Sequence, residues 1–315
     1  AAPEGSAAAA FARSRSLPLS IIPPRRDPFV LGALYGLKRT ADKNRIDVVN
    51  AHTGRAQTMA WVLSRIAAGE PALVRTKADA KRPSVGFTMG KAALVIAGSG
   101  AIKAMYTGAG LSPERIEVIY QGIAAAPAGR GQEPLPPKIG ILGRLDPVKG
   151  HLCFLEAAAL VLKKFPSAEF LIAGREENIK YSALRRRAEE LGVAGRVGFM
   201  GHVPDAAEFN RSCGIGVIAS LGSEAVSRAA LEWMAAGRPL VATAVGCLPE
   251  LVAPEWLVPP QNPAAMADRL ISLLRSPEAM RAAGERNRTR AAEDLAPAAF
   301  AERTERAFLK AARRA

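Results

Sequence analysis

Residues 220–252 read S-L-G-S-E-A-V-S-R-A-A-L-E-W-M-A-A-G-R-P-L-V-A-T-A-V-G-C-L-P-E-L-V. A loop runs into a helical stretch, and a Gly-Arg-Pro turn then leads into the apolar run Leu240 to Val245, which is typical of a strand. Two carboxylates, Glu224 and Glu232, are separated by seven residues. If Glu224 precedes the helix and Glu232 lies two turns inside it, both side chains can face one cleft. The alternative interpretation is an acidic helix-start residue and a solvated helix position.

Strands and helices alternate on both sides of a segment rich in proline and glycine, residues 124–137. Before it, the patterns predict strands at 17–22, 46–51, 72–76, 93–97 and 116–120, and helices at 29–44, 54–68 and 99–109. After it, they predict strands at 138–142, 168–173, 196–200, 214–218, 239–243 and 256–258, and helices at 149–164, 179–191, 205–211, 225–236, 263–275, 277–294 and 297–314. Such alternation favours parallel sheets with right-handed crossovers. We therefore expect an α/β protein with two doubly wound domains, residues 1–128 and 138–296, joined by a linker at 129–137.

A second motif, residues 138–150, reads K-I-G-I-L-G-R-L-D-P-V-K-G. An apolar strand ends at Gly143, and Arg144 and Lys149 follow in a short loop. Glycine lets the backbone approach a ligand, and the two cations suit a pair of phosphates. This motif, followed about eighty residues later by the two glutamates, resembles the retaining glycosyltransferases of family 4. The resemblance runs from about Asp47 to the C-terminus and is densest between residues 138 and 252.

The resemblance implies a GT-B fold, in which two Rossmann-like domains face a cleft, and it implies roles for single residues. Gly143, Arg144 and Lys149 match the segment that binds the diphosphate of a nucleoside-diphosphate sugar. Glu232 matches the residue at the ribose, and Glu224 matches the catalytic glutamate at the transferred sugar. The other implied contacts are helix-start amides at Ala225, Val226 and Ser227, which would face a phosphate, and Gly201 and Val203 near the nucleotide base. The helix 297–315 matches the segment that crosses back to the first domain.

Two departures from the family pattern concern the site. Family members usually carry glycines after the first glutamate, where this chain has Ala225, Val226 and Ser227. We associate this variant with enzymes of lipopolysaccharide core and surface-glycan synthesis. Many members also have an active-site histidine where this chain has Lys77 and Ala78. The nearest alternative is His52, which we include among the candidate catalytic residues, although a lone histidine is more often a packed or hydrogen-bonded residue.

The N-terminal stretch A-A-P-E-G-S-A-A-A-A-F-A-R differs from the opening strand and Gly-Gly loop of the family. It resembles the helix that normally follows the second strand. We expect either a truncated start or a rebuilt acceptor side, and in both cases an unusual N-terminal domain. Gly98-Ser99-Gly100 resembles the start of a dinucleotide-binding motif, but Lys103 occupies the position of its third glycine. Capping of a helix by Ser99 is therefore the better interpretation.

Composition is consistent with this class of protein. The chain has 315 residues, 49% of them hydrophobic, and its three cysteines show no paired spacing, which argues against a disulfide framework or a zinc site. No apolar run is long enough to cross a bilayer, and we expect a cytoplasmic protein.

The net charge is +14, and residues 1–125 contribute 17 Lys/Arg against 8 Asp/Glu. Such a field attracts anionic partners, and an anionic membrane surface or a phosphorylated glycolipid fits better than nucleic acid, for which no binding module is present. The alternative is a genome that simply favours arginine.

Two classes of function remain. The first is a glycosyltransferase that moves a sugar from a nucleotide-sugar donor to a glycan or glycolipid acceptor, such as lipopolysaccharide core, at the inner face of the inner membrane. No Asp-x-Asp pair is present, so we expect no metal or other cofactor, with Arg144, Lys149 and helix-start amides taking the leaving-group charge. The second is a GT-B protein that binds the donor but catalyses weakly or not at all. A GT-B sugar epimerase would need acid/base residues that the sequence does not supply.

Overall fold

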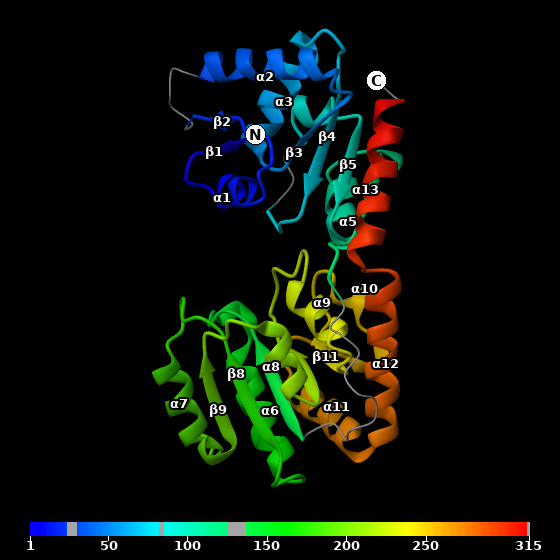
Figure 1. Cartoon of the computed structure of the whole chain (residues 1–315). Helices are drawn as coiled ribbons and strands as arrows, with labels where there is room; N and C mark the ends of the chain where they lie inside the picture. The colour runs from blue at the N-terminus through cyan, green and yellow to red at the C-terminus, as the bar shows by residue number, and fades with distance from the viewer. Residues whose placement is uncertain (24–29, 82–84, 125–136, 314–315) are drawn as a thin grey trace.

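The computed structural model describes residues 1–23, 30–81, 85–124 and 137–313, and these form two α/β domains, one above the other in Figure 1. Most of the predicted linker, 129–137, lies outside the described residues. The N-terminal domain contains β1 (Ala2–Pro3), α1 (Ala7–Ser14), β2 (Ile21–Ile22), α2 (Val30–Asn44), β3 (Val48–Ala51), α3 (Gly54–Ile66), β4 (Ala72–Lys77), α4 (Phe87–Gly90), β5 (Leu94–Ala97), α5 (Gly100–Gly108) and β6 (Ile116–Val118).

The main sheet of the N-terminal domain is parallel, in the order β3-β4-β5-β6. A separate parallel pair joins β1 to β2. The prediction of one strand over 17–22 was wrong, because only Ile21 and Ile22 pair with a neighbour. Pro18 and Pro23 flank this pair, and proline has no N–H to donate to a ladder. The short strand β1 and the one-turn helix α4 were not predicted.

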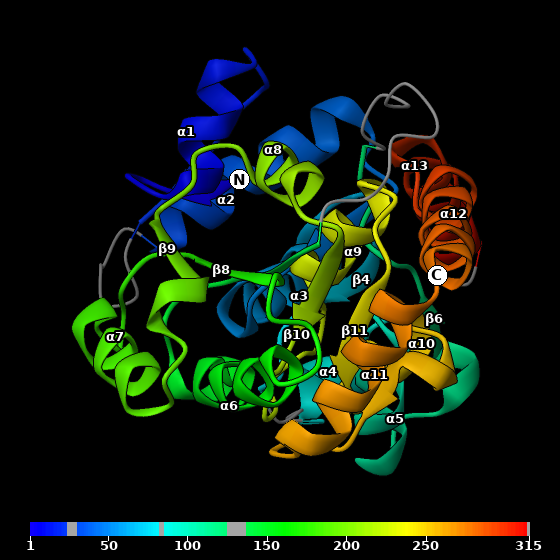
Figure 2. The ribbon, with the colours of Figure 1, turned by 90° about the horizontal axis from the view of Figure 1, so that it is seen from below.

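The C-terminal domain is built around a six-stranded parallel sheet in the order β12-β11-β10-β7-β8-β9. Its elements are β7 (Lys138–Leu142), α6 (His151–Leu162), β8 (Glu169–Ala173), α7 (Tyr181–Glu190), β9 (Val197–Gly201), α8 (Ala206–Ser212), β10 (Ile215–Ile218), α9 (Arg228–Ala235), β11 (Leu240–Thr243), α10 (Leu248–Leu251), β12 (Leu257–Val258), α11 (Pro263–Arg275), α12 (Pro277–Glu293) and α13 (Pro297–Ala312). Helices cover both faces of this sheet (Figure 2). Every predicted strand of this domain is present, within two residues at its ends.

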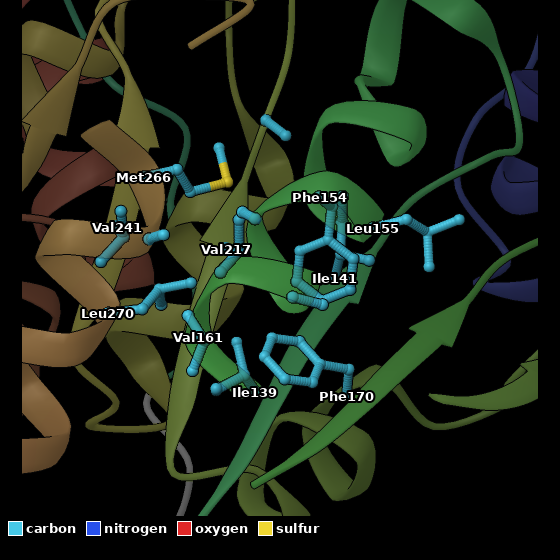
Figure 3. Close-up of a cluster of buried hydrophobic side chains, with 14 of the residues drawn as sticks. Ile139, Ile141, Phe154, Leu155, Val161, Phe170, Val217, Val241, Met266 and Leu270 are labelled. Atoms are coloured by element: carbon cyan, nitrogen blue, oxygen red, sulfur yellow. The ribbon is translucent and has the colours of Figure 1, made fainter. Parts of the chain in front are cut away.

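The core of the C-terminal domain fixes the ends of its central strands. On one face of the sheet, Ile139 and Ile141 of β7 pack with Phe154 of α6 and Leu270 of α11 (Figure 3). On the other face, Trp233 of α9 is fully buried. A Cβ added to Gly216 of β10 would lie 2.4 Å from the Trp233 ring, so glycine lets α9 lie directly on the strand. The loops that follow β7 and β10 therefore start from rigid positions.

The last two helices run along one side of both domains (Figure 1). α12 belongs to the C-terminal domain, and α13 packs on the N-terminal sheet, where Ala307 and Ala311 are buried against Val74 and Leu94. Their small side chains let the helix lie close to the strands. The chain therefore begins its crossing between the domains near residue 119 and returns through α13.

The carboxyl ends of the two sheets face each other across the domain interface. Ser99, just after β5, caps α5 as expected, and its hydroxyl also donates a 2.6 Å hydrogen bond to the carbonyl of Ala225 in the other domain. The carboxylate of Glu250, after β11, accepts from the amides of Gly100 and Ala101 at 2.7 and 2.6 Å and from the Tyr120 hydroxyl. These bonds place a negative charge at the positive end of α5 and hold the domains together.

Candidate functional site

The loop after β7 is held in one conformation by its own sequence. Asp146 accepts a 2.9 Å hydrogen bond from the amide of Val148 and caps the single turn Pro147–Lys149. Gly150 follows in the left-handed region, with φ of 73°. A Cβ at this position would lie 1.9 Å from the carbonyl oxygen of Ala219, so only glycine allows the loop to touch the end of β10. The contact carries Lys149 to the segment after β10.

Glu224 lies at the centre of the site. Its side chain is 4% exposed, and its Oε1 accepts from the Lys149 ammonium at 2.5 Å and from the Ser220 hydroxyl at 2.6 Å. Its carbonyl accepts from the amide of Cys247 at 2.7 Å, and Gly246 approaches so closely that a Cβ there would lie 2.1 Å from this oxygen. A buried carboxylate needs such a charge partner, because its desolvation is costly. Lys149 and Glu224, predicted to serve phosphate and sugar, thus contact each other directly.

A cavity of about 20 Å³ lies beside this pair and has room for about one water molecule. Gly143, Lys149, Ser220, Glu224 and Ala229 contribute to its lining. His151 contributes too, and the ring is fully buried. Burial lowers the pKa of His151 to about 4, so the imidazole is neutral at physiological pH. The ion pair borders this cavity.

Arg144 and Glu232 each form an ion pair of their own, separate from the Lys149–Glu224 pair. The Arg144 guanidinium is about half exposed and donates a 2.9 Å hydrogen bond to Glu177. Glu232 lies on α9, with its side chain 18% exposed, and accepts a 2.8 Å bond from Arg228 one turn earlier. Glu224 precedes α9 and Glu232 lies inside it, about one turn from its start rather than the two turns considered above. Each side chain occupies a different ion pair.

The predicted helix start at residue 225 was wrong. α9 begins at Arg228, because Ser227 is extended, with φ of −90° and ψ of 90°. The amide of Ser227 donates to the Cys247 sulfur. Ala225 belongs to a buried cluster of the N-terminal domain, and Val226 packs against the same cluster. The side chains that replace the family's glycines therefore fill the domain interface.

Gly201 is the last residue of the edge strand β9, and Val203 follows two residues later. Gly201 is in the left-handed region, with φ of 69°, and its carbonyl accepts from the amide of Gly174 at 2.7 Å. Val203 packs against a cluster that contains Ala173 and Ile218, the last residues of β8 and β10. Both residues are thus at the carboxyl edge of the sheet, where open α/β sheets bind ligands.

His52 follows β3 on the N-terminal side of the interface. The ring is exposed and lies 3.2 Å from the amide nitrogen of Asn50. The protein around the ring and the Arg75 guanidinium lower the pKa of His52. Lys77, at the position near which the family has a histidine, is buried and paired with Asp79. Among the described residues, His52 makes no hydrogen bond or ion pair with Lys149 or Glu224.

Sequence reasoning assigned no role to Ser220, His151 or Glu250. Ser220 lies two residues after the apolar strand β10, and His151 directly follows the Lys149-Gly150 pair, so both lay inside the motifs. The role of Glu250 requires the other domain, which no local pattern reveals. Within the four described ranges, no group of three or more His, Cys, Asp and Glu side chains is placed to hold a metal ion. No described helix combines the length and apolarity that a bilayer span needs.

Comparison with known proteins agrees with this architecture. Residues 136–276 match the family model described as "Glycosyl transferases group 1". The D-inositol 3-phosphate glycosyltransferase of Segniliparus rotundus is 32% identical over 189 residues, which cover 55% of this chain and 42% of that protein. The matched region thus spans less than half of this relative's length.

Solved structures extend the likeness over both domains. The Anabaena protein HepE in complex with UDP superposes with a TM-score of 0.79 at 20% identity, covering 95% of this chain and 88% of its own. The lipopolysaccharide outer core galactosyltransferase WaaB gives a TM-score of 0.72 at 14% identity, covering 95% and 85%. The chain has the GT-B fold, and residues 136–276 of its C-terminal domain match the model of group 1 glycosyltransferases.

Proposed function

We propose that this protein is a retaining glycosyltransferase that transfers a sugar from a nucleoside-diphosphate sugar to a glycan or glycolipid acceptor without a metal ion. One observation carries the proposal: Lys149, Glu224 and Ser220 meet at the carboxyl ends of β7 and β10 in a group 1 domain. A cation and a buried carboxylate at this edge suit a donor that has a diphosphate next to a sugar rich in hydroxyls.

The leaving group is the first task of the site. Departure of a nucleoside diphosphate leaves negative charge on the phosphates, which fixed cations stabilise best in a site sheltered from water. Lys149 is one such cation, and its side chain is 25% exposed, so it can reach a ligand in the cleft. Arg144 is the second, and it must exchange Glu177 for the diphosphate. An exposed ion pair of this kind is worth about 0–1 kcal/mol, so the exchange costs little.

The sugar and the ribose are held by the two glutamates. When Lys149 turns to the phosphate, the Oε1 of Glu224 loses one partner and can accept from hydroxyls of the transferred sugar. Ser220 keeps that carboxylate oriented. Glu232 would exchange Arg228, whose side chain is 67% exposed, for the ribose hydroxyls. Same-face substitution assisted by the departing phosphate gives retention and requires no covalent nucleophile from the protein.

Similar proteins support a proposal for the donor and for the acceptor. HepE has been solved with UDP and with UDP-glucose, which favours a uridine diphosphate sugar as the donor here. WaaB acts on lipopolysaccharide outer core, which supports a lipopolysaccharide-core or related glycolipid acceptor. Ala225, Val226 and Ser227, in place of the family's glycines, add to this assignment.

Turnover and stereochemistry test the proposal together. Incubation with UDP-glucose, UDP-galactose, UDP-N-acetylglucosamine and GDP-mannose, with and without EDTA, should show release of the nucleoside diphosphate from one donor. Proton NMR of the product should show the same anomeric configuration as the donor. An inverted product, or release that EDTA abolishes, would contradict a retaining and metal-independent mechanism.

A second function is favoured by one observation. Lys77 and Ala78 occupy the stretch where many family members have a histidine, and within the described residues the exposed His52 makes no hydrogen bond with Lys149 or Glu224. A protein that binds the donor without turning it over would fit this arrangement. Binding of a nucleoside diphosphate without release of any from its sugar derivatives would identify it.

Membrane docking would bring the N-terminal domain to a glycolipid acceptor on the cytoplasmic face of the inner membrane. On α2, Leu31 and Tyr35 are exposed apolar residues, and Lys38 and Arg39 follow on the same helix. Each basic residue near an anionic surface contributes about 1 kcal/mol. Cosedimentation with liposomes should require anionic lipid, weaken at high salt, and weaken again in a Lys38→Gln/Arg39→Gln variant. Equal binding to neutral and anionic liposomes would leave the basic residues without this role. Arg25 and Arg26 are two further basic residues that we expect to contribute to this docking, and they lie outside the described residues.

A further inference from the structure

Two cations are buried side by side on β4. Side chains alternate along a strand, and Leu73, Arg75 and Lys77 share the face on which Leu73 packs against Ala60 of α3. Arg75 is 4% exposed and Lys77 is 6% exposed. Burial raises the pKa of the Tyr106 hydroxyl on α5, and the Arg75 guanidinium partly offsets this rise. Arg75 therefore lies close to α5. Lysine and arginine are almost never this buried unless they are paired.

The described residues provide only one carboxylate for these two charges. The Lys77 ammonium pairs with Asp79, whose side chain is 48% exposed. No described acidic residue forms an ion pair with Arg75, and its Nε and Nη1 are buried without a hydrogen-bond partner. Leaving such donors unsatisfied destabilises the folded protein, and more so when the group is charged. The site therefore has spare hydrogen-bond donors and an excess positive charge.

These cations lie at the cleft end of the N-terminal sheet. The carbonyl of Lys77 accepts from the amide of Gly98 at 2.9 Å. A Cβ added to Gly98 would lie 2.7 Å from Val226, so Gly98 packs directly against the C-terminal domain. Lys77 is hydrogen-bonded to Gly98 and therefore lies next to this junction. Lys149 and Glu224 project from the opposite side of this junction. The buried cations thus belong to the side of the cleft opposite the proposed donor site.

We propose that Arg75 and Lys77 form an anion subsite that binds a phosphate group of the acceptor, with the Asp79 carboxylate occupying Lys77 until the acceptor arrives. The inference rests on the proposed glycosyltransferase function for the identity of the ligand as an acceptor. Guanidinium and ammonium groups together match the charge and the several acceptor oxygens of a phosphate monoester. Because Asp79 is half exposed, incoming phosphate can displace it and reach Lys77.

Calorimetric titration with inorganic phosphate tests this subsite. UDP is kept at a saturating concentration so that phosphate cannot bind at the donor site. If UDP fails to bind, the titration is made with the Lys149→Met variant, which lacks the donor site's cation. Phosphate should bind the wild type under both conditions, and Arg75→Gln and Lys77→Gln should each weaken it at least 10-fold. Asp79→Asn, an exposed change that removes the competing carboxylate, should strengthen binding several-fold. Lys43→Gln, which removes an exposed cation in the last turn of α2, just before β3 and at the opposite end of the sheet, is the matched control and should change little.

Asp79→Asn should strengthen phosphate binding, whereas Arg75→Gln and Lys77→Gln should weaken it. The Asp79→Asn result therefore tests the subsite even if a variant of a buried cation folds poorly. Phosphate that UDP displaces, with Asp79→Asn leaving the affinity unchanged or lower, would overturn the subsite. Failure of UDP to bind would count against the donor proposal alone, because phosphate binding through Arg75 and Lys77 can still be read in the Lys149→Met background.

Discussion

Replacing Glu224 by glutamine should reduce turnover about 10²–10³-fold while leaving the affinity for a free nucleoside diphosphate almost unchanged. A preorganised polar group at the reacting centre is typically worth this much in turnover. Glutamine keeps the shape of the side chain and still accepts from Ser220, but it loses the charge that the Lys149 ammonium now contacts at 2.5 Å. Free nucleotide lacks the sugar that Glu224 would hold, so its binding should not respond.

Steady-state kinetics and calorimetry on the same preparation separate these effects. Glu232→Gln provides the contrast, because its proposed partner is the ribose, and it should weaken nucleotide binding. Glu255→Gln is the matched control, since Glu255 is a half-exposed residue paired with Arg286 away from the site. Equal damage to nucleotide binding in the Glu224 and Glu232 variants would refute the division of roles.

Replacing Lys149 by methionine should weaken nucleoside-diphosphate binding by about 1.5–3 kcal/mol, or roughly 10- to 150-fold, as expected for a hydrogen bond to a charged group. It should also lower the free energy of unfolding by about 3 kcal/mol, because Glu224 is 3% exposed and would keep a buried charge without its cation. Urea unfolding measures the second effect.

A double variant distinguishes the two consequences. Lys149→Met combined with Glu224→Gln removes the uncompensated charge, so it should recover much of the lost stability but none of the nucleotide affinity. Lys163→Met, an exposed lysine at the end of α6, controls for the loss of one positive charge. If the double variant is as unstable as the single one, the ion pair does not govern the stability of this loop.

The sequence predicted the strand positions of the C-terminal domain well because each strand is a short apolar run bounded by glycine, proline or charged residues. β7 and α11 lie at the predicted residues. The start of α9 was missed by three residues, because Ala225 and Val226 have good helical character but are drawn into the N-terminal core. Tertiary contacts overrode local preference at this point.

The site shows the same limit. The candidate residues at the carboxyl edge were identified from the motifs, and the direct contact of Lys149 with Glu224 was not, because it depends on the close approach of Gly150 to Ala219. Glu250 and Arg75 were also missed as features of interest. The amides that bind Glu250 lie in the other domain. Arg75 is of interest because its side chain is buried, and the pattern of residues along the strand does not predict that burial.

Calorimetric titration of the wild-type protein with UDP, GDP and ADP in the presence of EDTA decides whether this domain holds a metal-independent donor site. We expect one of the three to bind with no divalent metal present, and the same titration of Lys149→Met to show binding at least 10-fold weaker. No heat of binding with any of them, or equal affinity of the wild type and Lys149→Met, would contradict a donor site at the carboxyl ends of β7 and β10.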